Sequence, residues 1–165
     1  MGTMFYDGMT KEMAVASIVK GAIKHSVVGN IVYYAAKSSA DPEITFVGVA
    51  KLTKDGNSFG IKHMSEDMGP YYFDCPESIL KLSTLNTAYA IEWRQKCRDV
   101  RAAKAAAKTF ASTLKAGDTF LWDGKEVTFI RQYKGGKVVG SLNGTPYAFK
   151  ISQIKAKPVV CSDEI

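Results

Sequence analysis

Five cationic side chains recur along one stretch of the sequence at spacings typical of a single helix face. Arg94, Arg98, Arg101, Lys104 and Lys108 follow one another at intervals of four, three, three and four residues. On a helix that rises 1.5 Å per residue, they form a stripe about 21 Å long. Such a stripe could bind the phosphates of a nucleic-acid backbone. The alternative is a solvated helix face, because Ala, Lys and Arg are all strong helix formers.

Residues 87–115 read as one long helix that would carry this stripe. Asn86 or Thr87 can cap its start, and Ala116-Gly117 is a typical helix end. At 100° per residue a second, apolar face is predicted to pack on the protein, with Cys97 at its edge. Its members are Tyr89, Trp93, Val100, Ala103, Ala107, Phe110 and Leu114.

The charge of the chain is concentrated around this helix. Residues 84–116 contain seven Lys+Arg and two Asp+Glu, a net charge of +5, out of +6 for the whole chain. Residues 1–83 sum to −1 and residues 117–165 to +2. An excess of positive charge favours an anionic partner: nucleic acid, an acidic protein surface or a membrane surface. The alternative is that the charge only keeps the protein in solution.

A second group of side chains could do acid–base chemistry. His63, Glu66, Asp67 and Asp74 lie around the Gly69-Pro70 turn, and a His with carboxylates can move protons or hold a metal ion. Cys75 at a helix start is a further candidate nucleophile, with His63 as its base. The alternative is that these carboxylates accept hydrogen bonds from turn and helix-cap amides.

Other classes of function find less support in the sequence. The chain has no P-loop, no G-x-G-x-x-G, no H-E-x-x-H and no G-x-S-x-G motif, so we expect no cofactor and no metal. Three widely spaced cysteines argue against a disulfide framework and for a reducing compartment. We expect no signal peptide and no membrane span. These features favour a cytoplasmic binding protein.

The first half of the chain is predicted to form a helix and a three-stranded antiparallel meander. The helix runs from a Thr10 cap to about Lys24, and Asp55-Gly56 marks a hairpin turn. A short helix opens at Pro76-Glu77, with Asp74 or Cys75 as its cap. The strands are predicted at residues 31–36, 44–53 and 58–64.

The last part of the chain changes to a period of two, which predicts a β-meander. Tight-turn dipeptides at Asp123-Gly124, Gly135-Gly136 and Asn143-Gly144 separate its strands. We predict an SH3-like small β-barrel, with Trp122, Arg131, Tyr133, Lys134 and Lys137 on a basic, aromatic edge; turn lysines that only aid solubility are the alternative. The strands are predicted at residues 118–122, 126–132, 137–142, 145–150 and 157–161, with a helical turn at 151–154.

Two resemblances add to this interpretation. The segment KHMSEDMGPYYFDCPESILKL, followed by WRQKCR, resembles an uncharacterised family of small bacteriophage and mobile-element proteins with a small β C-terminal region. This resemblance implies a phage or mobile-element accessory protein in a bacterial cytoplasm and carries no established activity. The segment RAAKAAAKTFASTL is similar to the second helix of double-stranded-RNA-binding domains, but an extra helix precedes it here and residues 38–42 lack the Gly-Pro-x-His signature.

The sequence therefore predicts an α+β protein in three parts: residues 1–83, the long helix at 84–116 and the small barrel at 117–165. The first hypothesis for function is sequence-tolerant nucleic-acid binding through the helix stripe, assisted by Arg131, Lys134 and Lys137. The second is binding of a host protein with an acidic surface, such as a defence or nucleic-acid-processing enzyme, which would be inhibited or remodelled. The third is a hydrolytic enzyme centred on His63 and Glu66. The oligomeric state stays open.

Overall fold

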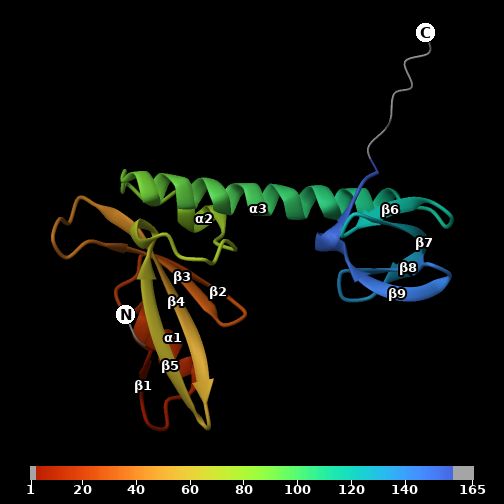
Figure 1. The fold of residues 1–165 in the computed structure, drawn as a ribbon. Helices are drawn as coiled ribbons and strands as arrows, with labels where there is room; N and C mark the ends of the chain where they lie inside the picture. The colour runs from red at the N-terminus through yellow and green to blue at the C-terminus, as the bar shows by residue number, and fades with distance from the viewer. Residues whose placement is uncertain (1–2, 158–165) are drawn as a thin grey trace. The chain divides into compact units, whose positions relative to one another are not determined.

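The computed structural model describes residues 3–157, and the chain divides into two compact units, Met1–Val100 and Arg101–Ile165 (Figure 1). The division falls inside the long helix α3, Ala88–Thr113, so each unit contains part of this helix. The long helix had been predicted as a part of its own.

The first unit is built on a five-stranded antiparallel sheet. Its three central strands are the predicted meander, which the structure confirms. Both edge strands were missed, because both are short and largely exposed. The strand order is β1-β5-β4-β3-β2, with β1 at Met4–Phe5, β2 at Lys24–Val28, β3 at Ile31–Lys37, β4 at Thr45–Asp55 and β5 at Ser58–Ser65.

The first helix is shorter than predicted, which explains the missed strand β2. Helix α1 covers Lys11–Val19 and does start at the predicted Thr10 cap, whose side chain accepts a hydrogen bond from the Met13 amide. Gly21 then adopts a φ of 79°, a left-handed conformation that a helix interior does not contain. The chain turns there and enters β2, so the prediction of a helix to Lys24 was wrong.

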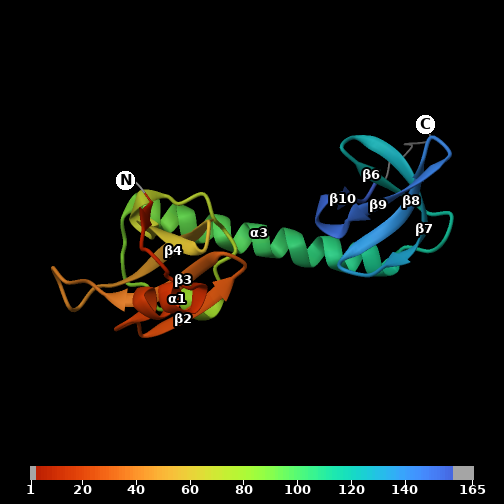
Figure 2. The same cartoon turned by 90° about the horizontal axis from the view of Figure 1, so that it is seen from below.

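Both faces of this sheet are covered by helices. Side chains alternate along β3, so that Val32 packs with α1 while Tyr33 packs on the opposite side. The Tyr33 side is covered by α2, Glu77–Leu80, and by the start of α3. Figures 1 and 2 show α1 and the first turns of α3 on different sides of the sheet. The first unit therefore has two apolar layers, one on each face.

The ends of the helices on the second face are only partly as predicted. Thr87 caps α3, because its hydroxyl oxygen accepts a hydrogen bond from the Ala90 amide at 3.3 Å. Neither Asp74 nor Cys75 caps α2: Pro76 occupies the cap position and makes no side-chain cap bond. Cys75 is buried in the apolar layer instead. A single-turn 3₁₀ helix, η1 at Glu66–Met68, follows β5 directly.

The second unit is a five-stranded antiparallel sheet packed against the last turns of α3. Its core contains Phe120, Val138 and Phe149 from the sheet and Ala111 from the helix. Asp123 and Asn143, each followed by Gly, have positive φ as the predicted tight turns require. The order is β10-β6-β7-β8-β9, with β6 at Thr119–Trp122, β7 at Lys125–Tyr133, β8 at Lys137–Leu142, β9 at Thr145–Lys150 and β10 at Ile154–Lys155.

The first four strands of this sheet match the prediction, whereas the last lies earlier in the chain. A 3₁₀ turn, η2 at Ile151–Gln153, occupies the predicted helical turn. Strand β10 then pairs with β6, with Ile154 opposite Trp122. The prediction had placed this closing strand at residues 157–161, of which 158–161 lie outside the described residues.

Candidate functional site

The first cation of the predicted stripe, Arg94, lies inside the first unit. Its residue exposure is 8%, and Nη1 lies 2.5 Å from Oε2 of Glu66, which is fully buried. Arg94 also donates to the Ser83 hydroxyl oxygen at 2.7 Å and to the Leu85 carbonyl oxygen at 2.8 Å. Glu66 in turn accepts a hydrogen bond from the Val47 amide at 3.0 Å. This buried network joins α3, η1, β4 and the segment before α3.

The position of Arg94 follows from which face of α3 meets the sheet. Ala90, Trp93, Arg94 and Cys97 are the buried residues in the first half of the helix, and their spacing places them on one face. Tyr89 had been predicted on the buried face, but its side chain is 68% exposed. The buried face is thus rotated from the predicted one, and it includes the first cation of the stripe.

The second cation, Arg98, is held by a carboxylate at the surface. Its guanidinium contacts Glu77 of α2 at 3.1 Å, and both side chains are almost half exposed. The hydrogen bonds that Arg98 donates to Glu77 raise the pKa of Arg98 above its ordinary value. An ion pair this exposed contributes about 1 kcal/mol or less to stability. A phosphate that approached Arg98 would therefore compete with Glu77.

The other predicted cations all lie in the second unit. On α3, Arg101 is half-buried, whereas Lys104 and Lys108 are exposed. Arg131 on β7 and Lys134 in the turn after it are exposed, and the Arg131 guanidinium lies 5.3 Å from the centre of the Tyr133 ring. Lys137 is half-buried. Six of the eight predicted site residues therefore belong to one compact unit.

The division into two units also divides the charge of the chain. Residues 1–100 contain eleven Lys+Arg and eleven Asp+Glu, a net charge of zero. Residues 101–165 contain eleven Lys+Arg and five Asp+Glu, a net charge of +6. The entire excess of positive charge thus lies in the second unit. Boundaries drawn at residues 84 and 117 had assigned most of this charge to the helix.

The predicted acid–base cluster is divided between separate contacts. Glu66 belongs to the buried network, and Asp67 accepts a hydrogen bond from the Thr87 hydroxyl at the start of α3. His63 lies at the surface, with Nδ1 3.5 Å from the Tyr34 hydroxyl. The protein still removes part of its water, and this desolvation lowers the pKa of His63 below its ordinary value. The Asp74 amide donates to the Tyr33 hydroxyl. These contacts favour the structural interpretation of the cluster.

Two further observations bear on catalysis and metal binding. Cys75, the candidate nucleophile, is 1% exposed and packs in the apolar layer beside Trp93. Within residues 3–157, no group of three or more His, Cys, Asp or Glu side chains is placed to hold a metal ion.

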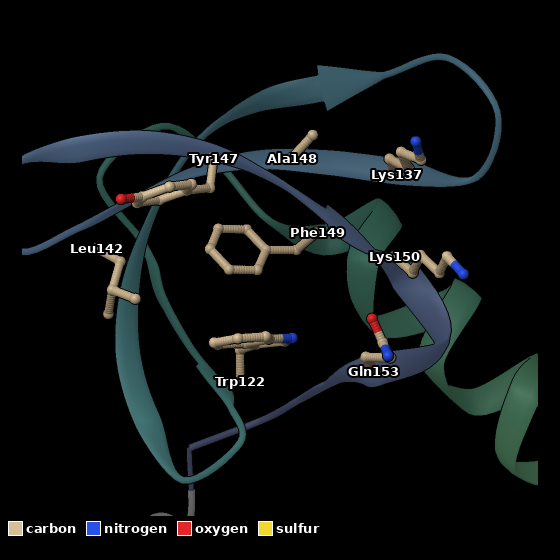
Figure 3. Close-up of a pocket in the computed structure, with 8 residues that line it drawn as sticks. All are labelled: Trp122, Lys137, Leu142, Tyr147, Ala148, Phe149, Lys150 and Gln153. Carbon is tan, nitrogen blue, oxygen red and sulfur yellow. The ribbon is translucent and has the colours of Figure 1, made fainter.

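A pocket of about 370 Å³ opens in the second unit (Figure 3). Trp122 and Tyr147 lie on either side of the Phe149 ring, with centroid distances of 5.3 Å and 6.3 Å to it. Phe149 is buried, whereas Tyr147 is 51% exposed. The pocket is lined by Trp122, Lys137, Leu142, Tyr147, Ala148, Phe149, Lys150 and Gln153.

The sequence prediction contained only part of this pocket. Trp122 and Lys137 belonged to the predicted basic, aromatic edge, but Tyr147, Phe149 and Lys150 did not. The signal that could have revealed them is the alternation in β9, where Tyr147 and Phe149 stand two residues apart and so share a face.

The first unit exposes a patch of apolar side chains, Met68, Tyr71 and Tyr89. Their exposed fractions are 54%, 88% and 68%. Together with Phe73, Trp93 and other residues they line a hollow of about 260 Å³. The helical projection of the sequence had placed Tyr89 on the buried face.

Comparisons with protein-family models, curated proteins and solved structures find no match to this chain. Within the described residues 3–157, none of the helices combines the length and the apolar character that crossing a membrane requires.

Proposed function

We propose that this protein binds nucleic acid through phosphate contacts, with little dependence on sequence, and that the binding surface lies on the second unit. The observation that carries this proposal is the division of charge, since one unit is neutral and the other has a net charge of +6. Polyanions are attracted to such a unit and gain entropy from released counterions.

The arrangement of the exposed cations supports the same proposal. Lys104 and Lys108 project from α3 among exposed alanines, which leave room for a phosphate backbone to approach. Lys134 adds a third exposed cation from the turn between β7 and β8. Lysine and arginine contacts to phosphates position a protein without reading bases. We leave Arg94 out of this surface because its guanidinium is engaged inside the first unit.

Two finer proposals concern the kind of protein. We propose that the second unit is an SH3-like barrel, supported by its strand order and by the 3₁₀ turn before the last strand. That fold hosts many functions, so it does not identify one.

We also propose that the protein is a phage or mobile-element accessory protein that acts in a bacterial cytoplasm. The motif residues behind that resemblance include Glu66, Trp93 and Arg94, which pack or pair in the first unit. Their identities are explained by folding, so they indicate no activity.

A salt titration tests the proposed function. Fluorescence anisotropy would measure the affinity of the full chain for a labelled 20-base-pair DNA duplex from 50 to 300 mM salt. If three or more phosphates are contacted, the log–log slope should be about −3 or steeper, since each contact contributes about −0.9. Duplexes of shuffled sequence should bind equally well. Absence of binding at 50 mM salt, or an affinity that does not change with salt, would contradict the proposal.

The exposed patch of the first unit favours a second candidate function, binding of a host protein that is inhibited or remodelled. Exposed tyrosines and methionines are enriched at protein interfaces. A pull-down from a nuclease-treated host lysate tests this function. The unmodified chain and Tyr147→Ala should both retain a host protein, and Tyr71→Ala should lose it. Equal retention by the Tyr71 variant would argue against this patch as the interface.

A further inference from the structure

We propose that the pocket beside Trp122 holds a nucleobase of a single strand, with a flanking phosphate at Lys137 and Lys150. This inference rests on the proposed function and deepens it, because it adds a stacking site to a surface that otherwise makes only phosphate contacts.

The aromatic side chains of the pocket are arranged as a stacking site. Phe149 is buried and packs against both Trp122 and Tyr147, which holds these two rings in place. Tyr147 remains half exposed, so one ring is open to a ligand (Figure 3). A volume of about 370 Å³ has room for one planar ring system. Bases stack on exposed aromatic side chains with about 1–3 kcal/mol each.

The lysines beside the pocket point to an anionic ligand. Lys137 and Lys150 are directly opposite each other in the pairing of β8 with β9, and like charges in that position destabilise a sheet. Neither has an ion pair within the described part of the chain. Both lie at the end of the pocket away from Tyr147 and Leu142 (Figure 3). A phosphate between them would relieve their repulsion.

The combination of rings and lysines distinguishes among ligands. A methylated lysine would suit the rings but would be repelled by Lys137 and Lys150. An acidic peptide would satisfy the lysines and leave the exposed Tyr147 ring without a planar partner. A nucleotide within a strand satisfies both features. The strand must be single, because the bases of a duplex are already paired and stacked.

The test compares a 15-nucleotide deoxythymidine strand with an abasic strand of the same length, using fluorescence anisotropy on the full chain. The unmodified protein should bind the thymidine strand at least about fivefold more tightly. Tyr147→Ala should weaken that binding by about 5- to 100-fold, as expected for one lost stack. It should leave the abasic affinity unchanged, because the phosphate contacts remain.

Three variants make this test specific. Tyr147→Phe should retain the preference for bases because the ring is kept, while Tyr147→Leu should lose it with similar apolar bulk. Tyr71→Ala is the matched control, since it removes an exposed tyrosine from the neutral unit. Unfolding midpoints of all variants would show that each protein is folded.

Each remaining outcome separates this inference from the proposed function. Equal affinity of the unmodified protein for both strands would overturn base stacking, while salt-dependent binding of both would keep the proposed function. Failure to bind either strand at 50 mM salt would overturn base stacking, and failure to bind the duplex as well would overturn both proposals. Binding of an oligoglutamate peptide that weakens in Tyr147→Ala would assign the pocket to a peptide instead.

Discussion

Replacing Arg94 with Ala should lower the free energy of unfolding of the first unit by about 3–5 kcal/mol. The substitution leaves the carboxylate of Glu66 fully buried without its cation. It also removes the donors to Ser83 and the Leu85 carbonyl. Urea denaturation would measure the loss. In a Trp122→Phe background the remaining tryptophan, Trp93, is buried in this unit and reports its unfolding.

The matched control is Arg98→Ala on the same helix. Its ion pair with Glu77 is almost half exposed, so the loss should be about 1 kcal/mol or less. Replacing Glu66 and Arg94 together with leucine should recover part of the stability, because no buried charge is left unpaired. Equal losses for Arg94→Ala and Arg98→Ala would show that the buried network does not hold the unit together.

This expectation also limits how nucleic-acid binding can be tested. A glutamate at position 94 would face the buried Glu66 carboxylate, so such a variant would lose binding by unfolding. Charge reversals that test binding must therefore avoid the buried face of α3. The exposed lysines of the second unit meet this requirement.

Local sequence patterns predicted the elements that depend on turns, helix caps and alternation within a short stretch of chain. Gly-containing turn dipeptides and alternating apolar residues located the strands from β3 to β9. Thr87 located the start of α3 to within one residue, and the predicted end at residue 115 lies two residues beyond Thr113. The edge strand β2, by contrast, has the sequence KHSVV and is mostly exposed, so it carries little alternation. Its pairing with β3 is a local hairpin through Gly29-Asn30, a turn dipeptide from which this strand could have been predicted.

The role of Arg94 could not be predicted, because it depends on a contact between distant parts of the chain. Its spacing from Arg98 and Arg101 is the same whether that side of the helix meets solvent or protein. Its partner in the buried network is Glu66, which lies 28 residues earlier in the chain. The small side chain of Ala90, fully buried, lies on the face that meets the sheet. A helical projection separates faces correctly, but it does not say which face is covered.

The division of charge between the two units was not predicted, because the predicted parts were bounded at residues 84 and 117 and the units meet at residue 100. Division by secondary structure put the whole of α3 in one part and grouped Arg94 and Arg98, which contact carboxylates of the first unit, with Lys104 and Lys108 of the second. Division by contacts separates them and leaves the first unit neutral. The position of the charge, more than its total, should then determine binding.

Two variants with the same net charge test this conclusion directly. Lys104→Glu, Lys108→Glu and Lys134→Glu together place three reversals on exposed residues of the second unit. Lys20→Glu, Lys37→Glu and Lys54→Glu place three on exposed residues of the first. Each combination lowers the formal net charge from +6 to zero. Any difference in binding must therefore come from where the charges lie.

The second-unit variant should bind duplex DNA about 100-fold more weakly at 100 mM salt. Each lost phosphate contact removes about one unit from the log–log salt slope, and three glutamates add repulsion. The first-unit variant should stay within about threefold of the unmodified protein, because it keeps the exposed cations of the second unit, and charges that contact no phosphate are largely screened at this salt. Anisotropy titrations would measure both affinities, and thermal unfolding would confirm that both proteins are folded. Equal losses would mean that the protein attracts DNA by net charge alone, with no binding surface on the second unit.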